Sequence, residues 1–307
     1  MKISIKYLLF YLTLLSPFFL LTSCEDVVTL DTETGPEQLV VDGWITNQPG
    51  AQTIRLSRSA AYFNNAAALP ALQASVELTD DAGNSYVFQD VQNNGIYQWT
   101  PESDSVALGK IGRTYTLRIR YEGEEYVSAN EIKRVPTIDS LIYTEERFPI
   151  DPPEGPREGY IAEFFARDFT GIGDTYWIKS LKGGKLYANE PTSISIAYDA
   201  SFSPGSPSDG LMFILPLRQS ITINQLFSAG DTVGVELHSI TNEAYYFLQQ
   251  VRQESSNGGI FAVPPANIPT NIRNVNPNGK KALGYFGASA VNRAETIIDP
   301  ARARPKE

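Results

Sequence analysis

The sequence contains one cysteine, Cys24, and one histidine, His238, among 307 residues. A single cysteine excludes an internal disulfide bond and any metal site built from several thiolates. A single histidine excludes metal centres that need two or three imidazole ligands. We therefore predict that the chain binds no metal and no cofactor. Its stability must then come from a buried apolar core.

Basic residues are fewer than acidic ones, with 25 Lys and Arg against 35 Asp and Glu, and the formal net charge is −10. Loss of Lys2 and Lys6 with a cleaved leader would make the charge −12. Phosphate backbones and anionic lipid surfaces attract basic proteins. The charge balance therefore argues against a nucleic-acid partner and against electrostatic attachment to a membrane.

The sequence also lacks a hydrophobic run of about 20 residues, the length that spans a bilayer. The longest run, residues 7–21, follows two lysines, and its last residue begins the sequence Leu21-Thr22-Ser23-Cys24. This arrangement is typical of a secretory signal peptide. The end of the run resembles the lipobox of bacterial lipoproteins, in which the cysteine is acylated and becomes the new N-terminus. We predict a signal peptide over 1–23 and lipidation of Cys24; the alternative is a plain signal peptide with a chance cysteine.

Two acidic residues, Glu25 and Asp26, follow the predicted lipidation site directly. They resemble the surface-export signal of Bacteroidota-type lipoproteins, although that signal usually places its acidic pair slightly later. We predict a lipidated tether over 24–36 and a location on the outer membrane, facing the cell exterior. Inner-membrane retention and a solvated linker without an addressing role are the alternatives.

Residues 37–136 alternate between apolar and polar side chains in short runs separated by turns. In the clearest run, Tyr115, Leu117, Ile119 and Tyr121 share one face of a predicted strand. A hairpin turn is expected over 80–84. About seven strands over about 100 residues are typical of an immunoglobulin-like β-sandwich.

Residues 137–292 are predicted to form a second β-rich domain with one α-helix. Strands are expected over 138–143, 160–166, 175–181, 193–198, 211–215 and 232–237. A helix is predicted near 241–255, with Thr241 as N-cap and Gly258-Gly259 as its end. The loops 149–159 and 201–210 are rich in proline, glycine and serine, and we expect them to be exposed. The tail 293–307 is expected to be disordered. The predicted fold class is thus mainly β.

Residues that could carry chemistry are few. His238 is predicted to be a structural or surface residue, because no Gly-x-Ser-x-Gly nucleophile motif occurs and Cys24 is used for lipid. The glycines of Gly171-Ile172-Gly173 are predicted to form a turn. The loop from Asp90 to Gly95 resembles a calcium loop only in part, and a hairpin turn is favoured. A pair of carboxylates that meets only in space stays open as a hydrolytic site.

The order of several short motifs resembles the Bacteroidota lipoprotein family called domain of unknown function 4249 (DUF4249). The likeness extends over about residues 24–290. The motifs are LVVDGWIT (39–46), RLSRS (55–59), LTDDAG (78–83), GRTYTL (112–117), IDSL (138–141), NI (271–272) and ALGYF (282–286). The resemblance implies an outer-membrane lipoprotein of a kind often encoded beside TonB-dependent transporters, with no assigned catalytic residues to transfer.

We therefore expect a non-enzymatic accessory or ligand-binding lipoprotein that works with a TonB-dependent outer-membrane transporter. Two other classes stay open. A surface hydrolase of glycan or peptide would need a clustered pair of carboxylates in a deep cleft. A structural or adhesive surface protein would bind other cells or matrix. An apolar patch rimmed by polar side chains would favour a protein partner.

The lipidation prediction can be tested with Cys24→Ala. A thioether to diacylglycerol requires the thiol, so the variant should lose all incorporation of labelled palmitate, while the wild-type chain is labelled. The measurement is fluorography of the immunoprecipitated protein. Equal labelling of the two proteins would show that the acyl chain is carried elsewhere.

Overall fold

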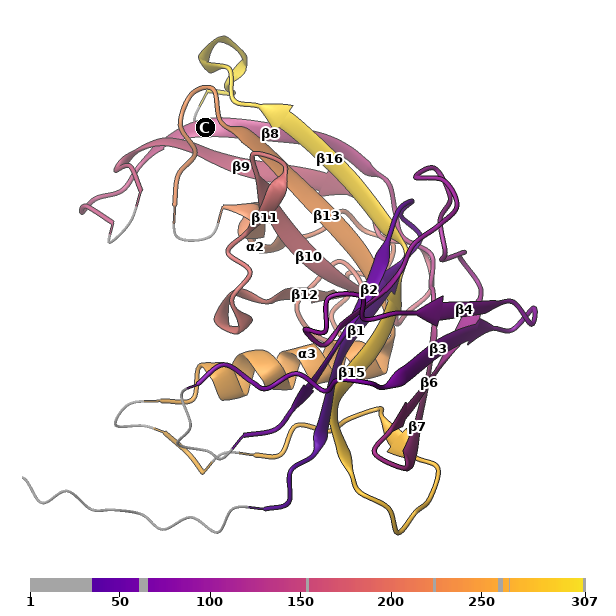
Figure 1. The fold of residues 1–307 in the computed structure, drawn as a ribbon. Helices are drawn as coiled ribbons and strands as arrows, with labels where there is room; N and C mark the ends of the chain where they lie inside the picture. Colours follow the sequence, from indigo (N-terminus) through magenta and orange to yellow (C-terminus); the bar gives the residue numbers. More distant parts are fainter. Residues whose placement is uncertain are drawn as a thin grey trace, which may run out of the picture. The chain divides into compact units, whose positions relative to one another are not determined.

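The computed structural model describes residues 35–60, 66–152, 155–222, 225–258, 262–264 and 266–305 (Figure 1). Cys24, Glu25 and Asp26, together with the predicted signal peptide, lie outside the described residues. Contacts divide the chain into a small unit, Met1–Pro36 with Ala61–Asn64, and a large unit that holds the rest. The fold below is that of the large unit. No helix among the described residues is long and apolar enough to cross a membrane.

The first β-sheet has the strand order β15-β1-β2-β5. In β1, Leu39, Val41 and Ile45 are buried on one face, which confirms the predicted alternation. The strand β1 pairs with β2 in antiparallel and with β15 in parallel orientation. The strands are β1 (Leu39–Thr46), β2 (Gln52–Arg58), β5 (Ile96–Trp99) and β15 (Ala282–Ser289).

The second sheet has the order β14-β7-β6-β3-β4 and is antiparallel throughout. Tyr115, Leu117 and Ile119 of β6 are buried, as their spacing predicted. Apolar side chains from both sheets form one core, so the two sheets make a β-sandwich. The strands are β3 (Ser75–Asp80), β4 (Ser85–Phe88), β6 (Thr114–Tyr121), β7 (Glu124–Glu131) and β14 (Arg273–Asn274).

The hairpin turn predicted over 80–84 is confirmed. The Asp80 carboxylate accepts hydrogen bonds from the backbone N–H groups of Ala82 and Asn84, at 3.0 and 2.8 Å. Gly83 adopts a φ of 86°, which favours glycine because it has no Cβ. These side chain to backbone contacts fix the register between β3 and β4.

The second β-rich region holds a five-stranded sheet with the order β11-β10-β13-β16, in which β12 also pairs with β10. A separate two-stranded ribbon, β8–β9, contributes Phe164 to the same apolar core as Tyr176 of β10 and Leu237 of β13. The strands are β8 (Ile138–Arg147), β9 (Glu158–Ala166), β10 (Thr175–Lys182), β11 (Lys185–Tyr187), β12 (Ser195–Tyr198), β13 (Thr232–Ile240) and β16 (Val291–Ile297).

The predicted helix is present as α3 (Asn242–Ser255). The hydroxyl of Thr241 accepts a hydrogen bond from the backbone N–H of Ala244 at 3.3 Å, which confirms the predicted N-cap. The predicted glycine end is wrong, because the helix stops at Ser255, three residues before Gly258. The short 3₁₀ helices are η2 (Pro191–Ser193), η3 (Gln219–Ile221) and η5 (Pro300–Arg302).

The strand predicted over 211–215 is also wrong. A short helix, α2 (Leu215–Arg218), begins at its end. Pro216 lies in the first turn of this helix, where a missing N–H costs no hydrogen bond and where the fixed φ suits a helix. Leu217 is then buried in the core of the second region.

The predicted boundaries need two corrections at the C-terminal end. The strand β15, expected in the second domain, belongs to the first sandwich, because its buried side chains Phe286 and Ala288 complete that core. The tail expected to be disordered from 293 instead continues β16 to Ile297. Ile298 is then buried in the second core, and the backbone N–H of Arg304 donates to the carbonyl of Tyr143 at 2.9 Å. Burial of Ile298 compensates for ordering this polar segment.

Aromatic side chains join the two β regions. The Trp44 ring of β1 lies 5.0 Å from that of Trp177 in β10, and 5.7 Å from that of Tyr285 in β15. Phe247 of α3 stacks on Tyr285 with ring centroids 4.5 Å apart. Such pairs contribute about 0.5–1.5 kcal/mol each beyond their buried area. This aromatic junction therefore holds β1, β15, β10 and α3 together.

The junction predicts a large effect of Gly287→Ala. A Cβ at this buried position in β15 would overlap the Trp44 indole, and forced repacking costs about 1–3 kcal/mol. The detergent-solubilised variant should unfold at lower urea concentration than wild type, as followed by tryptophan fluorescence. Gly258→Ala is the matched control, since a Cβ there meets nothing within 4 Å. Equal midpoints for the two variants would contradict this account of the junction.

Candidate functional sites

His238 lies in β13 with a buried side chain, next to Trp177 of the neighbouring strand. Its Nε2 is 3.1 Å from a carboxylate oxygen of Glu236. Burial, reinforced by the nearby Lys179 ammonium, lowers the pKa of His238 to about 4, although the Glu236 carboxylate acts in the opposite direction. The imidazole is therefore neutral at pH 7.

Lys179 completes this cluster on the face of the sheet opposite the apolar core. Its Nζ lies 3.8 Å from the centroid of the Trp177 ring, a cation–π geometry. Burial lowers the pKa of Lys179 to about 8, while the carboxylates of Glu236 and Asp42 act against that shift. Glu236 also accepts from Arg293 at 3.1 Å. The cluster ties three neighbouring strands together at the edge of the aromatic junction.

The calcium-like loop is a hairpin turn, as predicted. The carboxylate of Asp90 accepts from the backbone N–H groups of Asn94 and Gly95, at 3.1 and 2.8 Å. Asn93 and Gly95 both have positive φ, at 51° and 78°. The Asp90 oxygens are thus used by the turn itself. The glycines of Gly171-Ile172-Gly173 also have positive φ, which confirms the turn predicted there.

Sequence reasoning missed a cluster of three aspartates. Carboxylate oxygens of Asp168, Asp199 and Asp209 lie within 4.8 Å of one another, and the first two residues are buried. Asp199 accepts from the backbone of Gly173 at 2.7 Å, and Asp209 from that of Gly171 at 2.8 Å. Oxygen ligands of this kind suit hard cations such as Ca²⁺. No known spacing motif indicates the cluster, because Asp168 comes from a different loop than Asp199 and Asp209.

Asp168 is one of the two buried carboxylates of this cluster. Its carboxylate accepts from the Tyr176 hydroxyl at 2.5 Å and from the backbone N–H of Gly210 at 3.2 Å. Burial raises the pKa of Asp168, and the same burial with the adjacent carboxylate raises the pKa of Tyr176. The hydrogen bonds anchor the end of the loop 201–210. Its middle residues, 202–205, are exposed as expected, whereas Ser208 is buried.

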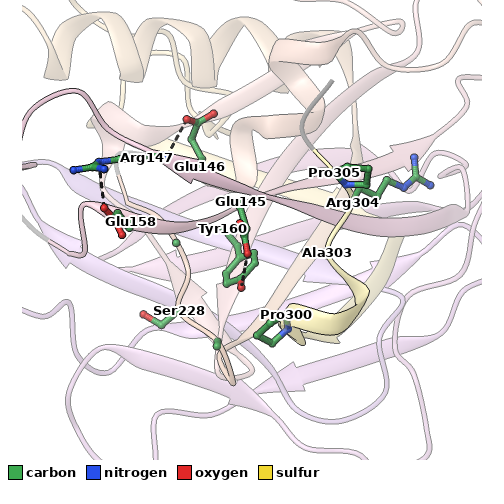
Figure 2. A pocket seen from close by; sticks show the side chains of 12 residues that line it. Glu145, Glu146, Arg147, Glu158, Tyr160, Ser228, Pro300, Ala303, Arg304 and Pro305 are labelled. Carbon is green, nitrogen blue, oxygen red and sulfur yellow. Dashed lines mark hydrogen bonds and ion pairs between the residues drawn. The ribbon is translucent and has the colours of Figure 1, made fainter.

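An acidic hollow of about 870 Å³ opens beside the β8–β9 ribbon (Figure 2). Glu145 and Tyr160 face each other across the ribbon, and the Tyr160 hydroxyl donates to Glu145 at 3.5 Å. Arg147 and Glu158 form an ion pair at 3.1 Å, with side chains 65% and 66% exposed. Glu145 and Glu158 come from one hairpin, and the ion pair of Glu158 is exposed to solvent. Such surface pairs contribute about 0–1 kcal/mol.

A larger hollow of about 1000 Å³, called here the hairpin groove, lies at the tip of the same ribbon. Its lining is mostly apolar and includes residues 148–152, Ile161, Leu186 and Leu226. Ile150 is 75% exposed and Leu186 is 47% exposed. Asp151 and Glu190 also line the hollow. The predicted proline-rich loop 149–159 therefore presents apolar side chains to solvent on a β scaffold.

These features define a mainly β protein whose sandwich is completed by a strand from the far end of the chain. The chain belongs to the family described as Domain of unknown function (DUF4249), whose family model matches residues 25–295. The family predicted from the order of motifs is thereby confirmed. Comparison with curated proteins finds no match.

The aspartate cluster predicts a clear cost for Tyr176→Phe. The variant removes the only hydroxyl that the described residues place on the buried Asp168 carboxylate, and hydrogen bonds to charged groups contribute about 1.5–3 kcal/mol. The free energy of unfolding in urea at pH 7 should fall by about that amount. Tyr246→Phe, at a tyrosine 46% exposed, is the control and should change little. If Tyr176→Phe changed the free energy of unfolding no more than Tyr246→Phe does, the stabilising role of the Tyr176–Asp168 hydrogen bond would be contradicted.

Proposed function

We propose that this protein is an outer-membrane lipoprotein, anchored through Cys24, that acts as a non-enzymatic binding partner of a TonB-dependent transporter. The hairpin groove is the surface that contacts the transporter. The observation that carries the proposal is the exposed apolar lining of this groove. A solvent-exposed hollow of this size with a mostly apolar lining is typical of sites that bind a ligand or a protein partner.

The groove has the composition of an interface core with a polar rim. Phe148, Ile150 and Leu186 supply apolar area, while Asp151 and Glu190 supply polar edges. Interface centres are depleted in charge and rims are solvated. Asp151 pairs with Arg157 at 3.5 Å with an 82% exposed side chain, so it stays hydrated at the edge. Burial of Ile150 by a partner would remove a large apolar side chain from water, which favours association.

A lipid anchor on Cys24 would allow a contact surface of moderate affinity to form a populated complex. Confinement to the membrane plane raises the effective concentration of the protein near other membrane proteins, so weak contacts become populated. The Glu25 and Asp26 signal would set which face of the outer membrane the protein occupies. The choice of a TonB-dependent transporter rests on the resemblance to lipoproteins often encoded beside such transporters.

Among the hollows described above, the acidic hollow offers the most carboxylates to the competing class, a surface hydrolase. There Glu158 is paired with Arg147 and both side chains are about two-thirds exposed. A general acid works best in a desolvated setting in which its proton is held near neutral pH. The apolar groove therefore supports binding better than the acidic hollow supports hydrolysis.

The proposal predicts that Ile150→Asp weakens capture of the transporter. A charge at the centre of an apolar interface must be desolvated, so recovery should fall at least about tenfold, equivalent to about 1.4 kcal/mol. The measurement is mild detergent extraction of native membranes, pull-down through a C-terminal tag and quantitative mass spectrometry. An unrelated tagged lipoprotein gives the background.

Ile111→Asp is the matched control, because Ile111 is 54% exposed and lies outside the groove. It should recover the transporter as wild type does. Recovery of wild-type protein without any transporter, in detergent that preserves known transporter–lipoprotein pairs, would refute the partner. Equal recovery with Ile150→Asp and Ile111→Asp would instead refute the groove as the contact surface.

A further inference from the structure

A third hollow, of about 630 Å³, lies on the β-sandwich where the edge strands of its two sheets meet. Gln89, which follows β4, and Gln98 of β5 form an antiparallel bridge with two backbone hydrogen bonds of 2.9 and 3.0 Å. This bridge uses the backbone groups that an added strand would need. The hollow is therefore suited to recognition by side chains, and pairing with an extended peptide is blocked at this point.

The lining of this hollow is neutral and rich in amides. Gln89, Gln92, Asn94 and Gln98 line it, and the described lining contains no charged side chain, although the chain as a whole carries a net charge of −10. Asp90 lies within the same segment, but its carboxylate accepts from the backbone of the turn. The hollow thus offers no cation for a phosphate or carboxylate and no carboxylate for a metal ion or an amine.

Each primary amide presents two N–H donors and two acceptor lone pairs. One side chain can therefore donate a hydrogen bond to a hydroxyl group or accept one from it. Gln98 uses one amide N–H on the Thr100 hydroxyl at 3.0 Å, and Asn94 uses one on Gln92 at 3.2 Å. These contacts orient the amides and leave further donors and acceptors on them. Several neighbouring amides with spare hydrogen-bonding capacity match a ligand with closely spaced hydroxyl groups.

Apolar surface accompanies the amides. Trp99 lines the hollow and is partly exposed, and Tyr86 stands edge-on to its ring at 5.7 Å and 87°. Val87 and Val91 add side chains that are 58% and 81% exposed. A sugar ring carries hydroxyls at its rim and C–H groups on its faces, so it needs both kinds of contact. An amide-rich rim with an indole and aliphatic side chains supplies them.

We propose that this amide hollow binds a neutral oligosaccharide. The site is independent of the hairpin groove: it lies on the first sandwich and uses different residues. The protein would thus hold a neutral glycan at one surface and its membrane partner at another. Carbohydrate binding here does not depend on the identity of that partner.

Affinity electrophoresis of the full chain tests the proposal, in native gels that contain an uncharged detergent. The probes are xyloglucan, galactomannan, mixed-linkage β-glucan and α-mannan, with polygalacturonate and heparin as anionic comparisons. Wild type should be retarded by at least one neutral polysaccharide and by neither anionic one. The double variant Gln89→Ala/Gln98→Ala should bind that polysaccharide at least about tenfold more weakly. Both side chains are exposed, so the fold should be kept.

Gln250→Ala is the matched control, since Gln250 is an exposed glutamine on α3. It should bind as wild type does. Trp99→Phe should also weaken binding, and its circular dichroism shows whether the sandwich is intact. Migration unaffected by every neutral probe, retardation by the anionic probes alone, or equal retardation of the double variant and Gln250→Ala would each overturn the proposal. None of these results depends on transporter capture, so the two proposals fail separately.

Discussion

The parallel pairing of β1 with β15 brings the first strand of the sandwich beside a segment more than 230 residues later. The pairing supports the aromatic junction, because Gly287 leaves room for the Trp44 indole. The chain then turns at Ala290 and enters β16 of the other sheet. Ser239 fixes this turn: its hydroxyl accepts from the Ala290 backbone at 3.0 Å and donates to the Lys133 carbonyl at 2.7 Å. One continuous segment thus supplies a strand to each β region, so neither core is complete without it.

The three hollows follow from the geometry of strands. In the β8–β9 ribbon, Tyr160 points toward the core side and borders the acidic hollow, whereas Ile161 points the other way and borders the hairpin groove. Successive side chains of a strand face opposite sides, so one hairpin forms two surfaces of different polarity. The amide hollow arises differently, where edge strands of two sheets meet through Gln89 and Gln98. A polar surface and an apolar one can therefore coexist on the same protein.

Buried titratable side chains in this protein are part of the scaffold. The buried Asp168 carboxylate and the His238 imidazole are each hydrogen-bonded and help hold loops or strands in place. Burial of such groups is tolerated when their hydrogen bonds are satisfied. The exposed acids give the body its negative charge. Against that background, the neutral lining of the amide hollow and the apolar lining of the hairpin groove are chemically distinct surfaces.

Local patterns in the sequence determined the mainly β class, the alternation in β1 and β6, the turn at Asp80, the Thr241 cap and the family. The family followed from the order of motifs along the chain. Each of the other features depends on interactions within a few residues, so a short window contains the information. The sequence could not indicate that β15 joins the first sandwich, that Ile298 orders the tail, or that α2 replaces a strand. Nor could it indicate the aspartate cluster, the hairpin groove or the amide hollow. These were decided by the tertiary structure, because they depend on side chains that become neighbours only when distant segments pack together.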